Sequence, residues 1–272
     1  STVGRLGQNN VVGGGGGATD TVLAVLCWRG RDVVNDSGGE DSFSNRNGGT
    51  SKTVTVSCLV LAGTDAGNYT VNSSASTTAD ITAKAITGNI TAANKVYDAN
   101  ASATILTRTL TGVLGTDAVS YSGGSASFND KNVAAGKTVT GTGLALAGAD
   151  AANYTVNGTA PTTADITAKA ITGSITAANK VYDANDVATI TARSLTGVLG
   201  ADVVNYSGGA ASFSNKNVGT TKTVTGTGLV LAGTDAGNYT VNSSATTTAD
   251  ITARTITGNI TAANKVYDAN AS

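Results

Sequence analysis

The side chains that could carry out chemistry are few. The chain of 272 residues contains no His, two Cys and a single Glu, Glu40. Without His it lacks the usual general base and the commonest metal ligand, and with one Glu most schemes that pair two carboxylates are excluded. We therefore expect no catalytic residues, no cofactor, no metal and no enzymatic activity.

Aspartate recurs in two short motifs that precede expected turns. The motifs are KVYDAN at 95–100, 180–185 and 265–270, and DAGNY or DAANY at 65–69, 150–154 and 235–239. Asp and Asn in such places usually accept hydrogen bonds from nearby backbone N–H groups and close an Asx-turn. A calcium site that uses Asp98 or Asp65 is the alternative, but the carboxylates are sparse and lack the spacing of a calcium loop. The motifs favour turns.

The aromatic residues, Trp28 apart, fall on four repeated positions. Large rings among Val, Ile, Leu, Ala and Thr are natural core elements because each buries far more area than its neighbours. The predicted core anchors are Tyr69, Tyr97, Tyr121, Phe128, Tyr154, Tyr182, Tyr206, Phe213 and Tyr239. The alternative is a glycan-binding module that stacks sugars on exposed Tyr97, Tyr121 or Tyr154, and the solvent exposure of those rings distinguishes the two.

Charge and hydrophobicity exclude two classes of partner. The chain has 17 basic and 18 acidic side chains, so it lacks the basic surplus that phosphate binding requires. Its longest strongly apolar run, residues 22–28, is too short to cross a bilayer. With 40% hydrophobic residues the chain is nevertheless expected to fold. We expect no nucleic-acid partner and no membrane insertion.

The chain repeats itself every 85 residues without a gap. ITGNITAANKVYDAN stands at 86–100 and 256–270, and at 171–185 it differs only at Ser174. Such a period indicates a tandem array. The expected domains are a divergent first repeat at 1–85, a second at 86–170, a third at 171–255, and the first strand or strands of a fourth, partial repeat at 256–272.

Within a repeat, apolar residues alternate with a period of two, and Gly, Asn and Asp clusters separate the segments. This pattern predicts an all-β fold of tandem Ig-like β-sandwich modules arranged end to end. In the third repeat the predicted strands are 174–178, 188–192, 203–206, 210–213, 222–231, 239–242 and 249–254. The buried parity changes between Lys84 and Ile86, which places a module boundary there with almost no linker. Gly226 and Gly228, in one strand, predict a bulge or a tight contact between sheets.

The first repeat departs from the others, mainly in residues 1–31. It is either a divergent end module or a degraded sequence. Both cysteines, Cys27 and Cys58, lie in this region and have no counterpart in the other repeats. They could pair in an oxidising compartment, and a chance origin is an equally good explanation.

The order of motifs resembles the YDG-type and related MBG repeats of very large bacterial surface proteins, including filamentous-haemagglutinin-like adhesins. In the second repeat these motifs are ITGNITAANKVYDAN, GVLGTDAVSYSGGSASFNDKNVAAGKTVTGTGL, AGADAANYTV and TTADITAK. The chain departs from the family at Ala99, Ala184 and Ala269, where Gly is common. The resemblance implies the structural repeat region of an extracellular bacterial adhesin or surface fibre, without catalysis. It also implies a glycan or protein receptor on a host or other surface.

Residues 256–272 are a copy of the repeat start without the rest of a repeat. An incomplete sandwich exposes unpaired edge groups that a strand of another chain can satisfy. We therefore predict head-to-tail self-association into a fibre, in which this segment supplies the first strand of the next subunit. The donor residues would be Ile256, Ile260, Val266 and Tyr267. The alternative is that the fragment was simply cut there.

Overall fold

The structure is a computed structural model that describes residues 35–36 and 40–271. Every regular element among these residues is a β-strand or a single turn of 3-10 helix, so the predicted all-β fold of tandem sandwich modules is confirmed. The described residues include no helix long and apolar enough to span a membrane.

The chain forms two compact units. The first contains the described residues up to Ile90, with Thr107–Ser125 and Gly141–Ala160. The second contains Thr91–Leu106, Ala126–Thr140 and the chain from Pro161 onward. The first unit therefore contains the described part of the first repeat with parts of the second, and the second unit contains the rest of the second repeat with the third.

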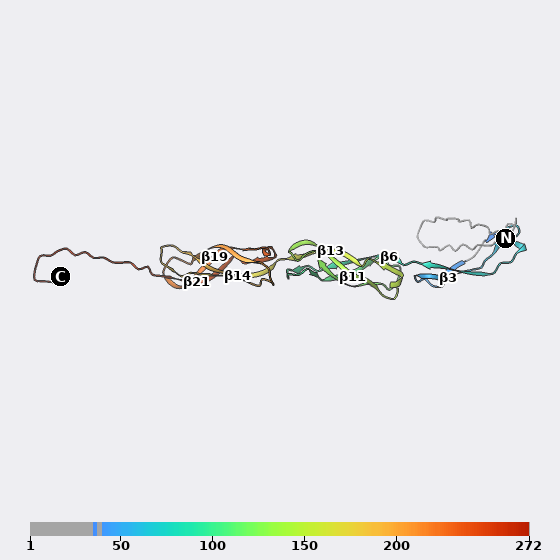
Figure 1. The fold of residues 1–272 in the computed structure, drawn as a ribbon, viewed down its shortest axis with the longest axis horizontal. Helices are drawn as coiled ribbons and strands as arrows, with labels where there is room; N and C mark the ends of the chain where they lie inside the picture. The colour runs from blue at the N-terminus through green and yellow to red at the C-terminus, as the bar shows by residue number, and fades with distance from the viewer. Residues whose placement is uncertain (1–34, 37–39, 272) are drawn as a thin grey trace. The chain divides into compact units, whose positions relative to one another are not determined.

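The third repeat lies in the second unit and consists of two sheets (Figure 1). The smaller sheet has the strand order β17 (Ile190–Thr196), β14 (Lys169–Ala177), β20 (Tyr239–Val241). The larger has the order β15 (Lys180–Val181), β21 (Ser244–Thr252), β19 (Gly219–Ala232), β18 (Asn205–Phe213), β16 (Val187–Ala188). The pairs β14–β20 and β15–β21 are parallel, and the other pairs are antiparallel.

The core of this repeat lies between its two sheets. Ile175 of β14 packs against Tyr206 of β18 and Leu229 of β19. Successive side chains of a strand point to opposite faces, so the alternating residues Ala249 and Ile251 of β21 both point inward and are buried. The predicted tight contact occurs at Gly226, where an added Cβ would lie 2.8 Å from Cδ1 of Ile175.

Two predicted strands of the third repeat, 203–206 and 210–213, are joined from Asn205 onward in a single strand, β18, and residues 203–204 are not in a strand. Residues 207–209 were not predicted as strand, and this prediction is wrong. Gly208 and Gly209 have φ angles of +70° and +81°, and Gly228 on the neighbouring strand has a φ of +71°. Glycine tolerates this left-handed conformation, so both strands distort together and the pairing continues in the same register beyond it.

The second repeat has the same strand order. Its smaller sheet is β9 (Ile105–Thr111), β6 (Lys84–Ala92), β12 (Tyr154–Val156). Its larger sheet is β7 (Lys95–Val96), β13 (Thr159–Thr167), β11 (Ala134–Ala147), β10 (Ser120–Phe128), β8 (Ser102–Ala103). A 3-10 turn of each repeat covers the DAGNY or DAANY motif: Ala66–Asn68, Ala151–Asn153 and Ala236–Asn238.

The first repeat is described from residue 35. It contains a sheet of β2 (Glu40–Phe43), β3 (Gly49–Ser57) and β5 (Ser74–Ile81), and a pair of β1 (Asn35–Asp36) with β4 (Leu61–Ala62). Cys58 is exposed and forms no disulfide with a described residue, and Cys27 lies outside the described residues. The divergent segment 1–31 also lies outside them.

Consecutive repeats are joined with almost no intervening chain. β13, in a sheet of the second repeat, ends at Thr167, and β14, in a sheet of the third, begins at Lys169. The buried residues change parity at this point, from Ala164 and Ile166 to Ile171 and Ile175. The chain thus leaves one core and enters the next while it remains extended.

Candidate functional site

The KVYDAN segment forms a turn built around its lysine. The Lys95 ammonium group donates hydrogen bonds to a carboxylate oxygen of Asp98 at 2.7 Å, the carbonyl of Asn100 at 2.8 Å and the carbonyl of Ser102 at 3.0 Å. Lys180 makes the equivalent contacts in the third repeat. The lysine thus satisfies carbonyl groups that the tight turn leaves unpaired.

The aspartates of the calcium alternative occupy different surroundings. Asp98 pairs with Lys95 instead of converging with other carboxylates, and Asp65 accepts a hydrogen bond from Thr64. Nowhere in the described part of the chain do three His, Cys, Asp or Glu side chains gather as a metal site would require. In the third repeat, the hydrogen bond from Lys180, opposed by partial burial, holds the pKa of Asp183 below its usual value.

Most of the predicted ring anchors are buried. The buried rings are Tyr97, Tyr121, Phe128, Tyr154, Tyr206, Phe213 and Tyr239. Tyr182 is half-buried. Tyr69 is 44% exposed, so the prediction of a core position is wrong there. β6 and β14 run beside Tyr154 and Tyr239, and no described strand of the first repeat takes their place beside Tyr69.

The alternative of sugar stacking on exposed tyrosines is wrong for the residues that it named. Tyr97 is 2% exposed, and Tyr121 and Tyr154 are each 6% exposed. The hydroxyl of Tyr121 also donates a 2.7 Å hydrogen bond to the carbonyl of Asn157. These rings have no free face on which a sugar could stack.

A polar cluster lies where the second repeat meets the third, within the second unit. The Asp202 carboxylate accepts hydrogen bonds from the Tyr97 hydroxyl at 2.8 Å and the Lys131 ammonium at 2.8 Å, both from the second repeat. It accepts a third, at 2.6 Å, from the Tyr239 hydroxyl of its own repeat. The Asp202 side chain is only 5% exposed, so this charge is desolvated and fully partnered.

This cluster fixes the protonation of its members. The hydrogen bond from Lys131, followed by that from Tyr239, lowers the pKa of Asp202 to about 2. Burial, followed by the bond to Asp202, raises the pKa of Tyr239 to about 12. The bonds to Asp202 and Tyr97 raise the pKa of Lys131. Near neutral pH no member is poised to exchange a proton, unlike a general acid or base.

Further polar and apolar contacts cross the same junction. The backbone N–H of Val133 donates to the side-chain oxygen of Asn238 at 2.9 Å, and Asn238 is 5% exposed. The rings of Tyr97 and Tyr239 meet edge to face, with centroids 5.3 Å apart. Tyr239 and Ile171 of the third repeat belong to one apolar cluster with Phe128, Val139 and Ile166 of the second. The two repeats therefore share buried polar and apolar contacts.

The first unit contains an equivalent set between the first and second repeats. The Arg46 guanidinium donates to Asp117 at 2.8 Å, and the Tyr154 hydroxyl donates to Asp117 at 2.6 Å. The N–H of Gly48 donates to the side-chain oxygen of Asn153 at 2.8 Å. The hydrogen bond from Tyr154, and then that from Arg46, lowers the pKa of Asp117.

We call these cross-repeat contacts the junction lock. Its members are Lys131, Val133, Asp202, Asn238 and Tyr239 at one junction, and Arg46, Gly48, Asp117, Asn153 and Tyr154 at the other. Each residue of the second set lies 85 positions before its counterpart.

A cleft of about 390 Å³ adjoins the lock of the first unit and is lined by Arg46, Leu114, Asp117 and Tyr154 among others. Of its charged groups, Arg46 and Asp117 already form an ion pair with each other.

The repeats also match a known family. Three successive stretches, residues 7–79, 82–164 and 167–249, match the YDG domain. The chain belongs to the YDG domain family. It matches no curated protein and no solved structure.

The geometry explains why glycine suits the third position of the YDG tripeptide. In this chain the position is occupied by Ala99, Ala184 and Ala269, with φ angles of +65°, +70° and +63°. The left-handed region costs an L-residue about 1–2 kcal/mol because its Cβ crowds the following carbonyl, and glycine avoids this cost. The alanine at this position of each of these YDG repeats therefore carries backbone strain.

The sequence reasoning missed the junction lock. Its signal was the recurrence of charged and amide residues at the 85-residue offset: Arg46 with Lys131, Asp117 with Asp202, and Asn153 with Asn238. Recurrence alone does not say which of these side chains meet, because lock partners such as Lys131 and Asp202 are 71 positions apart.

The predicted strand-donor residues lie after the last strand of the third YDG repeat. Ile256, Ile260, Val266 and Tyr267 are between 86% and 98% exposed. No strand forms between Ala253 and Ala271. Whether this segment pairs with another chain stays a prediction.

Proposed function

We propose that these YDG repeats are the structural repeat region of an extracellular bacterial adhesin or surface fibre, acting as a stalk or filament without catalysis. The observation that carries this proposal is the junction lock, which recurs with the same chemistry at two junctions. It specifies how one repeat meets the next at both junctions, which an array under tension requires and an isolated ligand-binding domain does not. The resemblance to repeats of large surface adhesins supports the same role.

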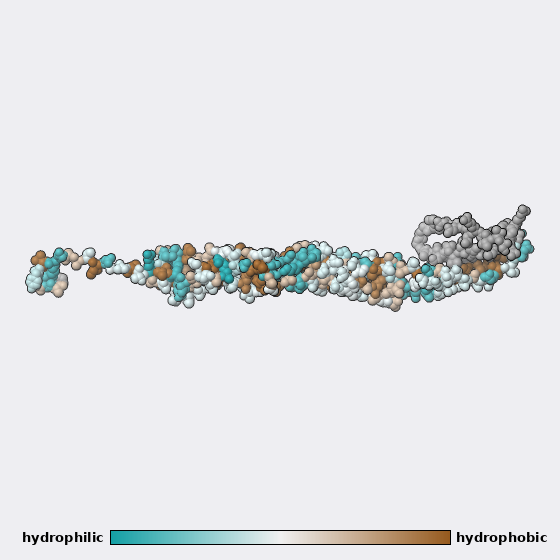
Figure 2. Space-filling view, in the orientation of Figure 1, coloured by the Kyte–Doolittle hydropathy of each residue, from teal (hydrophilic) through white to brown (hydrophobic). Residues whose placement is uncertain are grey.

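The chemistry of the site supports a mechanical role. The buried carboxylate Asp202 and its partners are held in fixed protonation states, as a structural ionic network requires. The described surface mixes hydrophilic and hydrophobic residues (Figure 2). The chain is nearly neutral overall. Neutral modules can follow one another in a long array without mutual repulsion.

The partners we propose for such a region are other copies of the chain, joined head to tail, and a glycan or protein receptor on a host or other surface. Sugar stacking on tyrosine is not favoured at Tyr97, Tyr121 or Tyr154, since their rings are buried. A receptor would meet side chains outside the junction lock.

Location and reach can be tested on intact cells of the organism that encodes the chain. An antibody against the second repeat should label intact cells, and a tag placed on the outer side of the array should move closer to the surface when residues 86–170, one full period, are deleted. Deletion of a full period joins the first repeat to the third, so Arg46 meets Asp202 in place of Asp117. Labelling only after cell lysis, or an unchanged tag position, would contradict the proposal.

A further inference from the structure

The end of the third repeat farthest along the chain carries the same groups with which the second repeat contacts the third. Tyr182, Lys216 and Val218 lie 85 positions after Tyr97, Lys131 and Val133. In the second repeat the tyrosine is 2% exposed, and the lysine and valine are half-buried. In the third repeat Tyr182 is half-buried, Lys216 is exposed and Val218 is 54% exposed.

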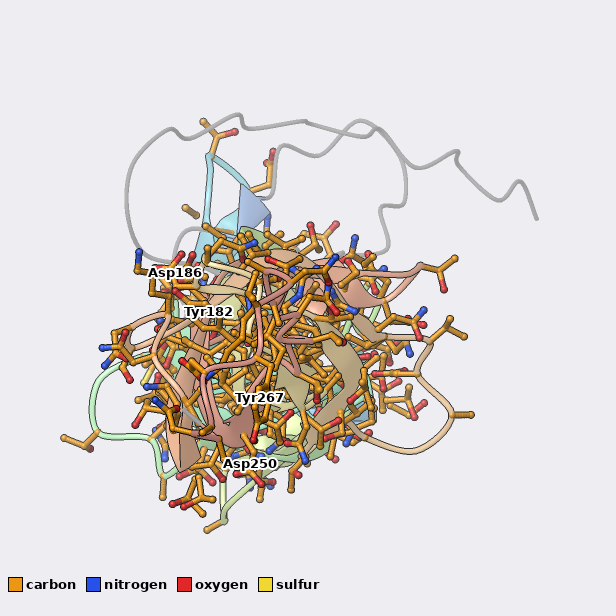
Figure 3. All side chains as sticks on the ribbon, turned by 90° about the vertical axis from the view of Figure 1, so that its left-hand side faces the viewer. Tyr182, Asp186, Asp250 and Tyr267 are labelled. Carbon is orange, nitrogen blue, oxygen red and sulfur yellow. The ribbon has the colours of Figure 1, made fainter. Side chains whose placement is uncertain are left out.

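Figure 3 looks onto this end and labels Tyr182. Within the described part of the chain, Lys216 forms no hydrogen bond or ion pair. This end thus combines an exposed cation, a half-buried tyrosine and an exposed valine, next to Val181, which is 56% exposed. A complementary surface would need a carboxylate for Lys216 and an acceptor for the Val218 N–H.

The segment that follows carries the first strand of a YDG module. Residues 256–272 are identical to residues 86–102, which contain all of β6 except its first two residues. In β6, Ile86 and Ile90 are 7% and 5% exposed, whereas their counterparts Ile256 and Ile260 are 86% and 98% exposed. Figure 2 shows apolar residues along this C-terminal segment. Their burial requires the remaining strands of a module.

We propose that the end of the third repeat, formed by Tyr182, Lys216 and Val218, is a docking surface for one further YDG module that uses residues 254–272 as its first strand. The docked module supplies its own Asp, Asn and Tyr at the positions equivalent to Asp202, Asn238 and Tyr239. This inference rests on the proposed function for its biological meaning, while the docking itself follows from the two locks.

The contacts follow residue by residue. Lys216 and the Tyr182 hydroxyl donate to the carboxylate equivalent to Asp202, as Lys131 and Tyr97 do. The Val218 N–H donates to the asparagine equivalent to Asn238, as Val133 does. The same geometry with Arg46 at the first junction shows that the cation can vary while the acceptor set is kept.

The test extends the full chain after Ser272 with the sequence of residues 103–170, which completes an exact copy of the second repeat. One Val of the added copy is replaced by Ile, so that its peptides have a distinct mass. A carbodiimide joins Lys and Asp only where they are in contact, and mass spectrometry then identifies the linked peptides. We expect Lys216 linked to the added copy of Asp117, at a yield comparable with the Lys131–Asp202 link in the same sample.

Two matched variants show which lysine forms each link. Lys216→Met should remove the new link and keep the Lys131–Asp202 link, and Lys131→Met should do the reverse. As a second measurement, exchange of the Val218 N–H should slow about tenfold or more on extension, because protection reports the local opening equilibrium. The Val133 N–H should not change.

Formation of the Lys131–Asp202 link without any Lys216 link, together with unchanged exchange at Val218, would overturn the proposal even if the added copy fails to fold. Links from Lys216 to a second unextended chain would assign the surface to self-association and would also overturn this occupant. Neither result bears on the antibody labelling of intact cells, so failure of the docking and failure of the proposed function can be told apart.

Discussion

Single residues of these repeats occupy unfavourable positions for different physical reasons. Asp202 is buried and charged, and it is stable only because three donors surround it. Ala184 is exposed and uncharged, and its backbone adopts a conformation that suits glycine. Both residues belong to motifs that recur with the 85-residue period, but only Ala184 differs from the residue that is common in the family.

Replacement of Ala184 by Gly should stabilise the third repeat by about 0.5–1 kcal/mol, because relief of left-handed strain exceeds the added entropy of the unfolded chain. Urea unfolding followed by tyrosine fluorescence would measure the change. Ala192→Gly, in extended strand β17, is the control and should be destabilising by about 0.5–1 kcal/mol. Loss of stability in both variants would refute the strain at Ala184.

The pH dependence of stability should follow the shifted groups of the lock. The folded pKa of Asp202, about 2, lies below its unfolded value, so its contribution is present above about pH 4 and is lost as the pH falls toward 2. The folded pKa of Tyr239, about 12, lies above its unfolded value of 10, so its contribution is lost as the pH rises from 10 toward 12.

Thermal unfolding between pH 2 and 12 would measure both effects. In Asp202→Asn the decline below pH 4 should be shallower than in the original chain, since this carboxylate no longer titrates. Asp183→Asn, at an exposed aspartate, should leave most of the acid decline in place. An acid profile unaltered by Asp202→Asn would speak against a buried, ionised Asp202.

At the scale of the element, the close approach of the two sheets requires glycine at one position in the first strand of a repeat. A Cβ on Gly173 of β14 would lie 2.4 Å from the ring of Tyr206. That ring cannot move freely, because its hydroxyl donates a 2.8 Å hydrogen bond to the carbonyl of Asn242. Gly88 and Tyr121 repeat the same contact in the second repeat.

Gly173→Ala should therefore destabilise the third repeat by about 1–3 kcal/mol through overpacking. The denaturant midpoint would show the loss. Gly237→Ala is a matched control, since no atom lies within 4 Å of the added Cβ, and it should change stability little. Equal effects of the two substitutions would mean that β14 and Tyr206 do not touch.

The elements were largely predictable from the sequence, and their partners were not. Alternation of apolar residues located the long strand β19 and the change of parity at the module boundary, because both depend on local burial. The continuous strand β18 was missed, since Gly208 and Gly209 resemble a turn until the distorted residue Gly228 on the neighbouring strand is seen. The lock joins residues 71 and 105 positions apart, and no local pattern encodes such a pairing.

At the scale of the whole molecule, the compact units do not coincide with the sequence repeats. Each unit contains a junction, so the contacts between consecutive repeats are as much a part of the folded structure as those within a repeat. In repeat proteins, stability is a sum of intrinsic terms and nearest-neighbour interface terms. The junction lock is the interface term of this chain, and the proposed function depends on its being favourable.

A double-mutant cycle across the junction tests this claim most directly. The free energies of unfolding of the original chain, Lys131→Met, Asp202→Asn and the double variant would be measured in urea. We predict a coupling of about 1–2 kcal/mol between the two residues, as expected for contacting groups in one hydrogen-bonded network. Additive effects, within about 0.3 kcal/mol, would contradict the account, because the second and third repeats would then be independent at this contact.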